Sequence, residues 1–165
     1  MKSMHRDRLP DFPLPNPALA AEDGAAADRA PSAPRAQIVS YSEDRRTRGM
    51  RTLLEITGES GLAVVQSLRT VAPDLADWII DFSYGDVMAR PGLDRRTRQL
   101  ATIAALTAMG NAQPQLKVHV QGALNVGCKP QEIIEVILQM AVFCGFPAAL
   151  NALAVVKEVT PPAPR

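Results

Sequence analysis

The fold class is decided by one stretch, Gln131-Glu-Ile-Ile-Glu-Val-Ile-Leu-Gln-Met-Ala-Val-Phe-Cys144. Pro130 precedes it and Gly145 follows it, which is typical of a helix start and a helix end. Apolar side chains fall on nearly every side of this predicted helix, and a helix that is apolar all round has to be buried all round. One small domain has little room for such a helix. We therefore expect a homo-oligomer whose subunits bury it.

Helical spacing of apolar residues continues on both sides of this stretch, interrupted by proline and glycine. The expected helices span residues 42–58, 61–71, 73–89, 94–109, 114–127, 130–145 and 147–158. Aromatic residues make up only 4% of the chain and β-branched runs are few, which also favours helix. About seven helices with short connections predict an all-α bundle.

The two ends of the chain differ from this helical part. Residues 1–41 hold six of the 14 prolines, and no helical or strand period survives there. We interpret them as a disordered extension or as an arm that crosses a neighbouring subunit. Such an arm would be anchored by Phe12, Leu14, Ile38 and Val39. The folded domain is expected to span residues 42–160, and residues 161–165 are a proline-rich tail.

Composition and charge exclude several classes of protein. The 18 Lys and Arg residues and 17 Asp and Glu residues leave a net charge of +1, which gives no reason to expect nucleic acid or a membrane as partner. No stretch reaches the roughly 18 apolar residues that span a bilayer, and the N-terminus lacks the apolar segment of a signal peptide. Cys128 and Cys144 cannot form a disulfide framework, and free cysteines fit a reducing compartment. We therefore expect a cytoplasmic protein.

His119 is the only histidine of the expected folded domain and lies in the middle of a predicted helix. A lone histidine on an apolar helix is either a satisfied structural residue or a general acid/base, because the pKa of imidazole lies near neutrality. No second histidine or cysteine pair accompanies it, and the positions three and four residues later hold Gly and Ala. We therefore predict no metal site.

Charged side chains flank a proline–glycine break before the fourth predicted helix. Asp86 lies inside an apolar helix, where it is exposed, paired with Arg90 four residues later, or directed into a pocket. Beyond the break, Arg95, Arg96 and Arg98 crowd the first turn of a helix, where the helix dipole disfavours cations. We expect these guanidinium groups to form salt bridges with acidic residues of another subunit or, as the alternative, to bind an anionic ligand.

Several motifs follow one another along the helical part. They are Arg90-Pro-Gly-Leu-Asp-Arg-Arg-Thr-Arg98, the apolar helix that ends at Gly110, His119-Val-Gln-Gly-Ala-Leu-Asn-Val-Gly127, and Gly145-Phe-Pro-Ala-Ala-Leu-Asn-Ala-Leu153. In order and spacing, over about residues 45–159, they resemble the carboxymuconolactone decarboxylase family. The resemblance implies an all-α fold whose subunits assemble into rings, often trimers or hexamers. It also implies one of two chemistries, cofactor-free decarboxylation of 4-carboxymuconolactone or thiol-dependent hydroperoxide reduction.

The resemblance favours the decarboxylase branch. The hydroperoxide branch needs a Cys-x-x-Cys-x-x-x-His motif, and the two cysteine positions before His119 hold Ala112 and Gln115. The proton-relay glutamate of that branch falls near Gln99, and an amide cannot transfer a proton in the same way. A Gly-Glu-Val segment of the decarboxylase branch matches Gly85-Asp86-Val87. The carboxylate is therefore kept, but it is one methylene shorter.

On this resemblance, His119 is the expected proton donor and Asp86 the carboxylate that orients or recharges it, while Tyr84, Arg90 and Arg98 are expected to bind the substrate. No cofactor is expected, because the lactone carbonyl takes up the electrons that CO₂ leaves behind. We expect a lyase of aromatic catabolism that acts on a carboxylated lactone, such as 4-carboxymuconolactone, or on a related enolisable acid. The alternatives are an isomerase or cyclase of secondary metabolism with the same pocket, and a non-catalytic oligomeric binding protein.

Overall fold

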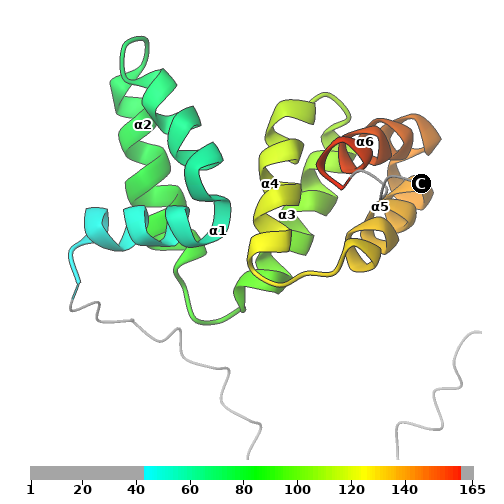
Figure 1. Cartoon of the computed structure of the whole chain (residues 1–165), viewed down its shortest axis with the longest axis horizontal. Coiled ribbons are helices and arrows are strands. Elements are labelled where there is room, and N and C mark those ends of the chain that lie inside the picture. The colour runs from blue at the N-terminus through cyan, green and yellow to red at the C-terminus, as the bar shows by residue number, and fades with distance from the viewer. Residues whose placement is uncertain (1–42, 161–165) are drawn as a thin grey trace, which may run out of the picture. The chain divides into compact units, whose positions relative to one another are not determined.

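The computed structural model describes residues 43–160, and within them every regular element is a helix (Figure 1). In chain order the helices are α1 (Arg45–Leu68), α2 (Pro73–Trp78), the π-helix η2 (Ile79–Met88), α3 (Arg95–Met109), α4 (Gln113–Asn125), α5 (Pro130–Cys144) and α6 (Phe146–Val159). The predicted all-α class is confirmed. The predicted N-terminal extension and C-terminal tail lie outside the described residues.

The helices agree with the sequence pattern, with two differences. The expected helices 42–58 and 61–71 form one element, α1, which is kinked at Gly58 (φ 60°, ψ −148°). Glycine adopts a positive φ at little cost. The chain therefore bends at Gly58, and the helix continues beyond it. The expected helix 73–89 is divided into α2 and η2, since the hydrogen bonding passes into the wider π pattern at Ile79.

The helices enclose two apolar cores. One lies between α1, α2 and η2 around Ile56 and Ile80, and the other lies between α3, α4, α5 and α6 around Ile103 and Ile137. These four side chains are fully buried. Val126, just after α4, packs against both cores. The two cores therefore meet at the C-terminal end of α4.

Two residues of α4 bring this helix close to α1. A Cβ atom at Gly122 would lie 3.2 Å from the carbonyl oxygen of Ile56, so only a glycine fits there without a shift. Asn125 donates from Nδ2 to the same carbonyl oxygen, 3.0 Å away. His119 lies one helical turn before Gly122. The contact between α4 and α1 therefore fixes the position of His119.

The helix α5, which decides the fold class, buries only one side against the other described residues. Ile133 and Ile137 are fully buried, whereas Val142 and Phe143 are 79% and 73% exposed. The exposed apolar surface continues onto α6, where Phe146 is 76% exposed. The homo-oligomer that would cover this surface stays a prediction.

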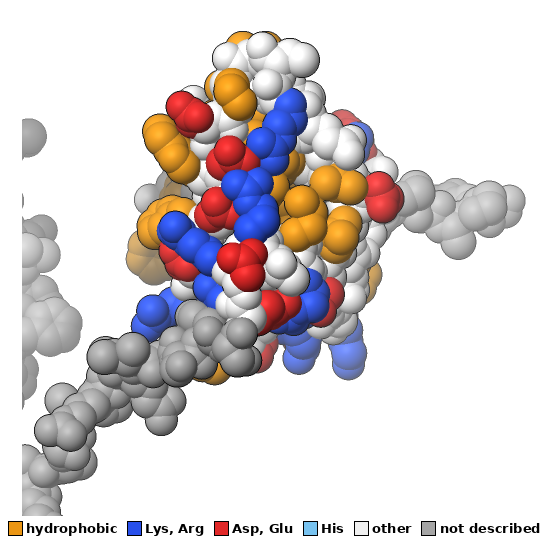
Figure 2. All heavy atoms as spheres, turned by 90° about the vertical axis from the view of Figure 1, so that its left-hand side faces the viewer, with side chains coloured by type: hydrophobic (Ala, Val, Ile, Leu, Met, Phe, Trp, Pro, Cys, Tyr) orange, Lys and Arg blue, Asp and Glu red, His pale blue; other side chains and the backbone are white. Residues whose placement is uncertain are grey.

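The opposite end of the molecule, at α1 and α2, carries a band of charged side chains with apolar side chains on both flanks (Figure 2). Ion pairs of α1 and its neighbours include Arg46 to Asp77 at 2.8 Å, Arg69 to Asp77 at 2.6 Å and Arg51 to Glu43 at 2.7 Å.

None of the helices between residues 43 and 160 combines the length and apolar character needed to cross a bilayer. The cytoplasmic location stays a prediction.

Candidate active site

A cavity of about 340 Å³ opens between α1, η2, α3 and α4. Its lining is mostly apolar, and its polar side chains are Ser83, Tyr84, Thr102, Gln115 and His119. No Asp, Glu, Lys or Arg of residues 43–160 lines it. A largely apolar cavity of this size with a few convergent polar groups has the properties of a small-molecule site.

The π-helix η2 carries Ser83 and Tyr84 to the cavity wall. Its close packing on α1 depends on Gly49, since a Cβ atom there would lie 2.1 Å from the carbonyl oxygen of Ile80. Burial raises the pKa of the Tyr84 phenol, and a hydrogen bond with Thr57 only partly offsets this. Tyr84 is therefore a neutral hydrogen-bond donor at neutral pH. The structure places it at the cavity, and its substrate-binding role stays a prediction.

His119 lines the cavity from α4 and is held by Gln99 of α3. The Nδ1 atom of His119 lies 2.9 Å from Oε1 of Gln99, whose side chain is fully buried. Burial lowers the pKa of His119 below its usual value of about 6.5, so the imidazole is mostly neutral at pH 7. An imidazole at a cavity wall with one nitrogen fixed is suited to proton transfer through the other nitrogen.

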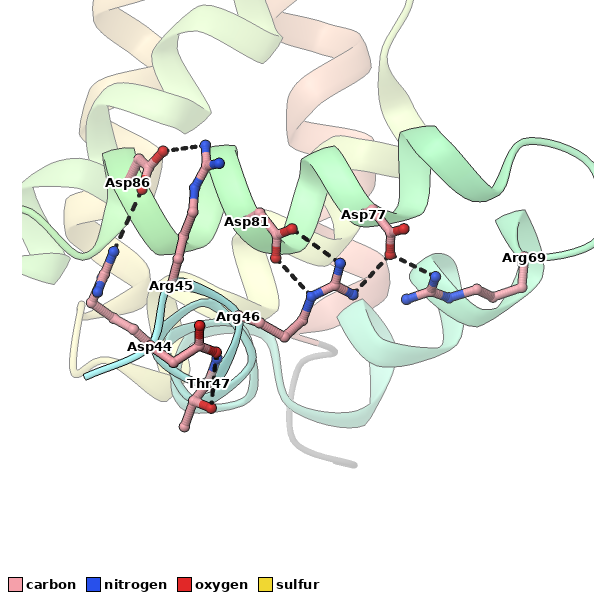
Figure 3. A network of polar contacts seen from close by, with 9 residues as sticks. Asp44, Arg45, Arg46, Thr47, Arg69, Asp77, Asp81 and Asp86 are labelled. Atoms are coloured by element: carbon pink, nitrogen blue, oxygen red, sulfur yellow. Dashed lines mark hydrogen bonds and ion pairs between the residues drawn. The ribbon is translucent and has the colours of Figure 1, made fainter.

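Asp86 belongs to an ion-pair network (Figure 3). It is not among the residues that line the cavity. Its carboxylate pairs with Arg45 and, at 3.5 Å, with the buried Arg48. This arrangement arises because η2 packs along α1 and turns Asp86 toward the first turn of that helix. Within the chain, the structure therefore does not bring Asp86 and His119 together at one cavity. The catalytic role of Asp86 stays a prediction.

The two arginines expected to bind substrate also lie outside the cavity lining. Arg90 is exposed, and its carbonyl oxygen accepts a hydrogen bond from Nη2 of Arg98, 3.1 Å away. The Nε atom of Arg98 is buried and has no hydrogen-bond partner among residues 43–160. The pairing of Arg90 with Asp86, one of the arrangements the spacing allows, is not among the ion pairs of the described residues. The substrate-binding role of both arginines stays a prediction.

The remaining arginines of the α3 first turn form salt bridges, as expected, but their acceptors lie in the same chain. Arg95 pairs with Glu55 of α1, and Arg96 pairs with Glu132 of α5 at 2.7 Å. All four side chains line an open groove of about 750 Å³. Because these charges neutralise one another, the groove is a weaker candidate for an anion site than its size suggests.

Cysteines and metal ligands do not gather in the described part of the chain. Cys128 is buried and Cys144 is partly buried, and both are free thiols. Among residues 43–160, no three or more His, Cys, Asp or Glu side chains are grouped so that they could hold a metal ion.

Gln99 is the site residue to which the sequence argument gave no role. Gln99, Ile103 and Thr107 lie four residues apart on α3, and all three are buried. The sequence does place Gln99 on the buried side of a helix, and a buried glutamine needs a hydrogen-bond partner. This need could have marked Gln99 as a candidate site residue. The partner itself, His119, lies on another helix, so the spacing alone could not identify it.

Comparisons with known proteins place these residues in a family context. The profile of the carboxymuconolactone decarboxylase family matches residues 73–158. The chain is 34% identical over 118 residues to a 4-carboxymuconolactone decarboxylase of Acinetobacter baylyi, which covers 71% of this chain and 87% of that protein. It is 38% identical over 98 residues to a nitrosuccinic acid decarboxylase of Metarhizium robertsii, which covers 58% of this chain and 68% of that protein. The matched region contains η2, α3 and α4, and therefore Tyr84, Gln99 and His119.

Proposed function

This chain belongs to the carboxymuconolactone decarboxylase family and is a decarboxylase, and we propose that its substrate is a carboxylated unsaturated lactone or a related enolisable acid. The two named relatives act on different acids, yet both acids can spread the electrons left by CO₂ within themselves. A conjugated lactone carbonyl accepts them in one case and a nitro group in the other. A substrate that is its own electron sink needs no cofactor.

The observation that supports this proposal is the position of His119, which lines a cavity of about 340 Å³ and has Nδ1 held by Gln99. In the proposed reaction the bond between the γ-carbon and the carboxylate carbon breaks, and CO₂ leaves. The electron pair passes through the double bond to the lactone carbonyl, forming a dienolate. His119 in its protonated form then gives a proton to the α-carbon, and solvent returns the proton to the imidazole. The net reaction consumes one proton and releases one CO₂.

The rest of the cavity supports the same reaction through its polarity. The lining is mostly apolar. An apolar environment destabilises the compact charge of the substrate carboxylate more than the charge that is spread over the dienolate. The phenol of Tyr84 is neutral at pH 7, so it brings polarity to the cavity wall without a negative charge that would oppose the developing oxyanion. Asp86, Arg90 and Arg98 lie outside the lining, so the proposed steps do not use them.

We also propose that the active species is a homo-oligomer, a trimer or a hexamer, in the cytoplasm. The exposed apolar side chains of α5 and α6 support an oligomer, since large exposed apolar side chains so near one another in the chain are typical of a protein interaction site. The free thiols of Cys128 and Cys144 fit a reducing compartment.

The test is release of CO₂ from 4-carboxymuconolactone and from nitrosuccinate by the full chain in the presence of EDTA. We expect CO₂ from at least one of these acids, with turnover that depends on His119. Conversion of one of these acids into an isomer without release of CO₂ would instead support the isomerase alternative. Absence of both reactions would contradict the proposed function.

A further inference from the structure

Gln99 is fully buried on α3 and does not line the cavity that His119 lines. Its Oε1 lies 2.9 Å from Nδ1 of His119. Its Nε2 is buried and has no hydrogen-bond partner among residues 43–160. An apolar side chain of similar size would fill the same space and leave no amide hydrogen unpaired. The contact with His119 is thus the one interaction in the described structure that gives this buried amide a role.

We propose that Gln99 is a positioning residue that holds His119 as the tautomer with its hydrogen on Nδ1, so that Nε2 is the nitrogen that exchanges a proton with the substrate. The Nδ1–H group donates to the amide oxygen of Gln99, and this contact also fixes the plane of the ring. The consequence for catalysis rests on the proposed function, whereas the tautomer does not.

The neutral amide of Gln99 adds no charge beside Nδ1, so burial remains the cause of the low pKa of His119. A carboxylate facing Nδ1 would stabilise the imidazolium and raise the pKa of His119. Burial is the cause of the shift in the pKa of His119, and no charged side chain contributes to it. The titratable side chains of residues 43–160 that line the cavity are only His119 and Tyr84. Tyr84 is neutral near pH 7 because burial raises its pKa. The imidazolium therefore gives up its proton readily and is recharged from solvent after each turnover.

The test reads the imidazole directly, by ¹⁵N NMR of the full chain labelled at histidine. In the wild type we expect His119 to carry its hydrogen on Nδ1 when it is neutral. In Gln99→Met, which keeps the bulk but removes the acceptor, we expect a mixture of both tautomers. The matched control is Thr107→Val, which removes another buried and unpartnered polar atom from the same helix and should leave the His119 signals unchanged.

Two results would overturn the proposal. One is a wild-type His119 with its hydrogen on Nε2, because the amide of Gln99 would then be the donor. The other is a Gln99→Met variant that keeps the wild-type tautomer. Neither NMR measurement needs a substrate. A wrong tautomer would therefore contradict the role of Gln99, whereas an inactive enzyme would contradict the proposed function.

A second variant covers the case in which Gln99→Met does not fold. In Gln99→Glu the side chain keeps its shape and gains a charge opposite Nδ1. We expect the titration midpoint of His119 to rise by at least one pH unit, measured by the same NMR signals. With a substrate in hand, the pH above which kcat/KM declines should rise by the same amount in Gln99→Glu. In Thr107→Val this pH should stay at the wild-type value. An unchanged midpoint would overturn the proposal.

Discussion

As the proposed proton donor, His119 has to meet two requirements that oppose each other. Burial keeps its pKa below the usual value of about 6.5, so most molecules hold a neutral imidazole at pH 7. A proton donor, however, has to be charged at the moment it acts. The two requirements are compatible because an imidazolium of low pKa gives up its proton readily, and water can return a proton to the imidazole between turnovers. The contact with Gln99 keeps the ring in position through both states.

Replacement of this side chain should separate chemistry from structure. His119→Gln retains a polar group that can bond to the amide of Gln99 but has no group that titrates near neutrality. We expect kcat to fall by on the order of 10²–10⁴, the usual contribution of a positioned general acid or base. CO₂ release measures the change, and the far-ultraviolet circular dichroism should match that of the wild type. Near-wild-type turnover by a correctly folded variant would exclude His119 as the proton donor.

The same imidazole makes stability depend on pH. The folded pKa of His119 lies below the unfolded value of about 6.5, so between these two values the unfolded chain binds more protons. The free energy of unfolding should therefore be highest above pH 6.5 and fall as the pH decreases through the folded pKa. Urea unfolding of the wild type and of His119→Gln at pH 7.5 and pH 5, at one protein concentration, isolates the effect. The wild type should lose more stability on acidification than the variant, and an equal loss in both would contradict this assignment.

At the level of elements, the sequence pattern predicts the helices better than it predicts their contacts. The N-cap at Asp94 and the C-cap at Gly110 of α3 follow from local chemistry, and the structure shows both, with Asp94 accepting from the backbone of Thr97 at 2.9 Å. The π character of η2 was not predicted, since the helical spacing of apolar residues does not distinguish a π-helix from an α-helix. Local sequence also could not predict which side chain pairs with Asp86. Its helical position is predictable, but its partner Arg45 is 41 residues away in the chain.

The contact between α1 and η2 can be tested at its tightest point. In Gly49→Ala the new methyl group would lie 2.1 Å from the carbonyl oxygen of Ile80, so the two elements have to separate. We expect a loss of about 1–3 kcal/mol in the free energy of unfolding, the usual cost of overpacking. We also expect lower activity, since η2 carries Tyr84 to the cavity. Urea unfolding and CO₂ release measure the two effects.

The control for this variant is Gly92→Ala, where a new methyl group meets no atom within 4 Å. It should change neither stability nor activity measurably. Equal stability of the two variants would show that α1 and η2 are not in the close contact described.

At the level of the whole molecule, the apolar surface of α5 and α6 is the feature that residues 43–160 do not explain by themselves. The sequence predicts that α5 must be covered on all sides, and in the single chain Val142, Phe143 and Phe146 are each more than 70% exposed. The cavity lies between other helices, α1, η2, α3 and α4. A subunit contact at α5 and α6 could therefore form without closing the cavity.

This separation leads to a prediction about assembly. Phe143→Glu places a charge in the exposed apolar surface, and a charge buried without a partner in a subunit interface opposes association strongly. We expect light scattering at micromolar concentration to show an oligomer for the wild type and a smaller species for Phe143→Glu. The matched control, Thr70→Glu, adds the same charge at an exposed polar position between α1 and α2 and should keep the wild-type mass. A folded 17.8 kDa monomer in the wild type would contradict the oligomer. An unchanged mass in Phe143→Glu would place the interface on another surface, because a buried carboxylate at this position could not be tolerated without a cationic partner.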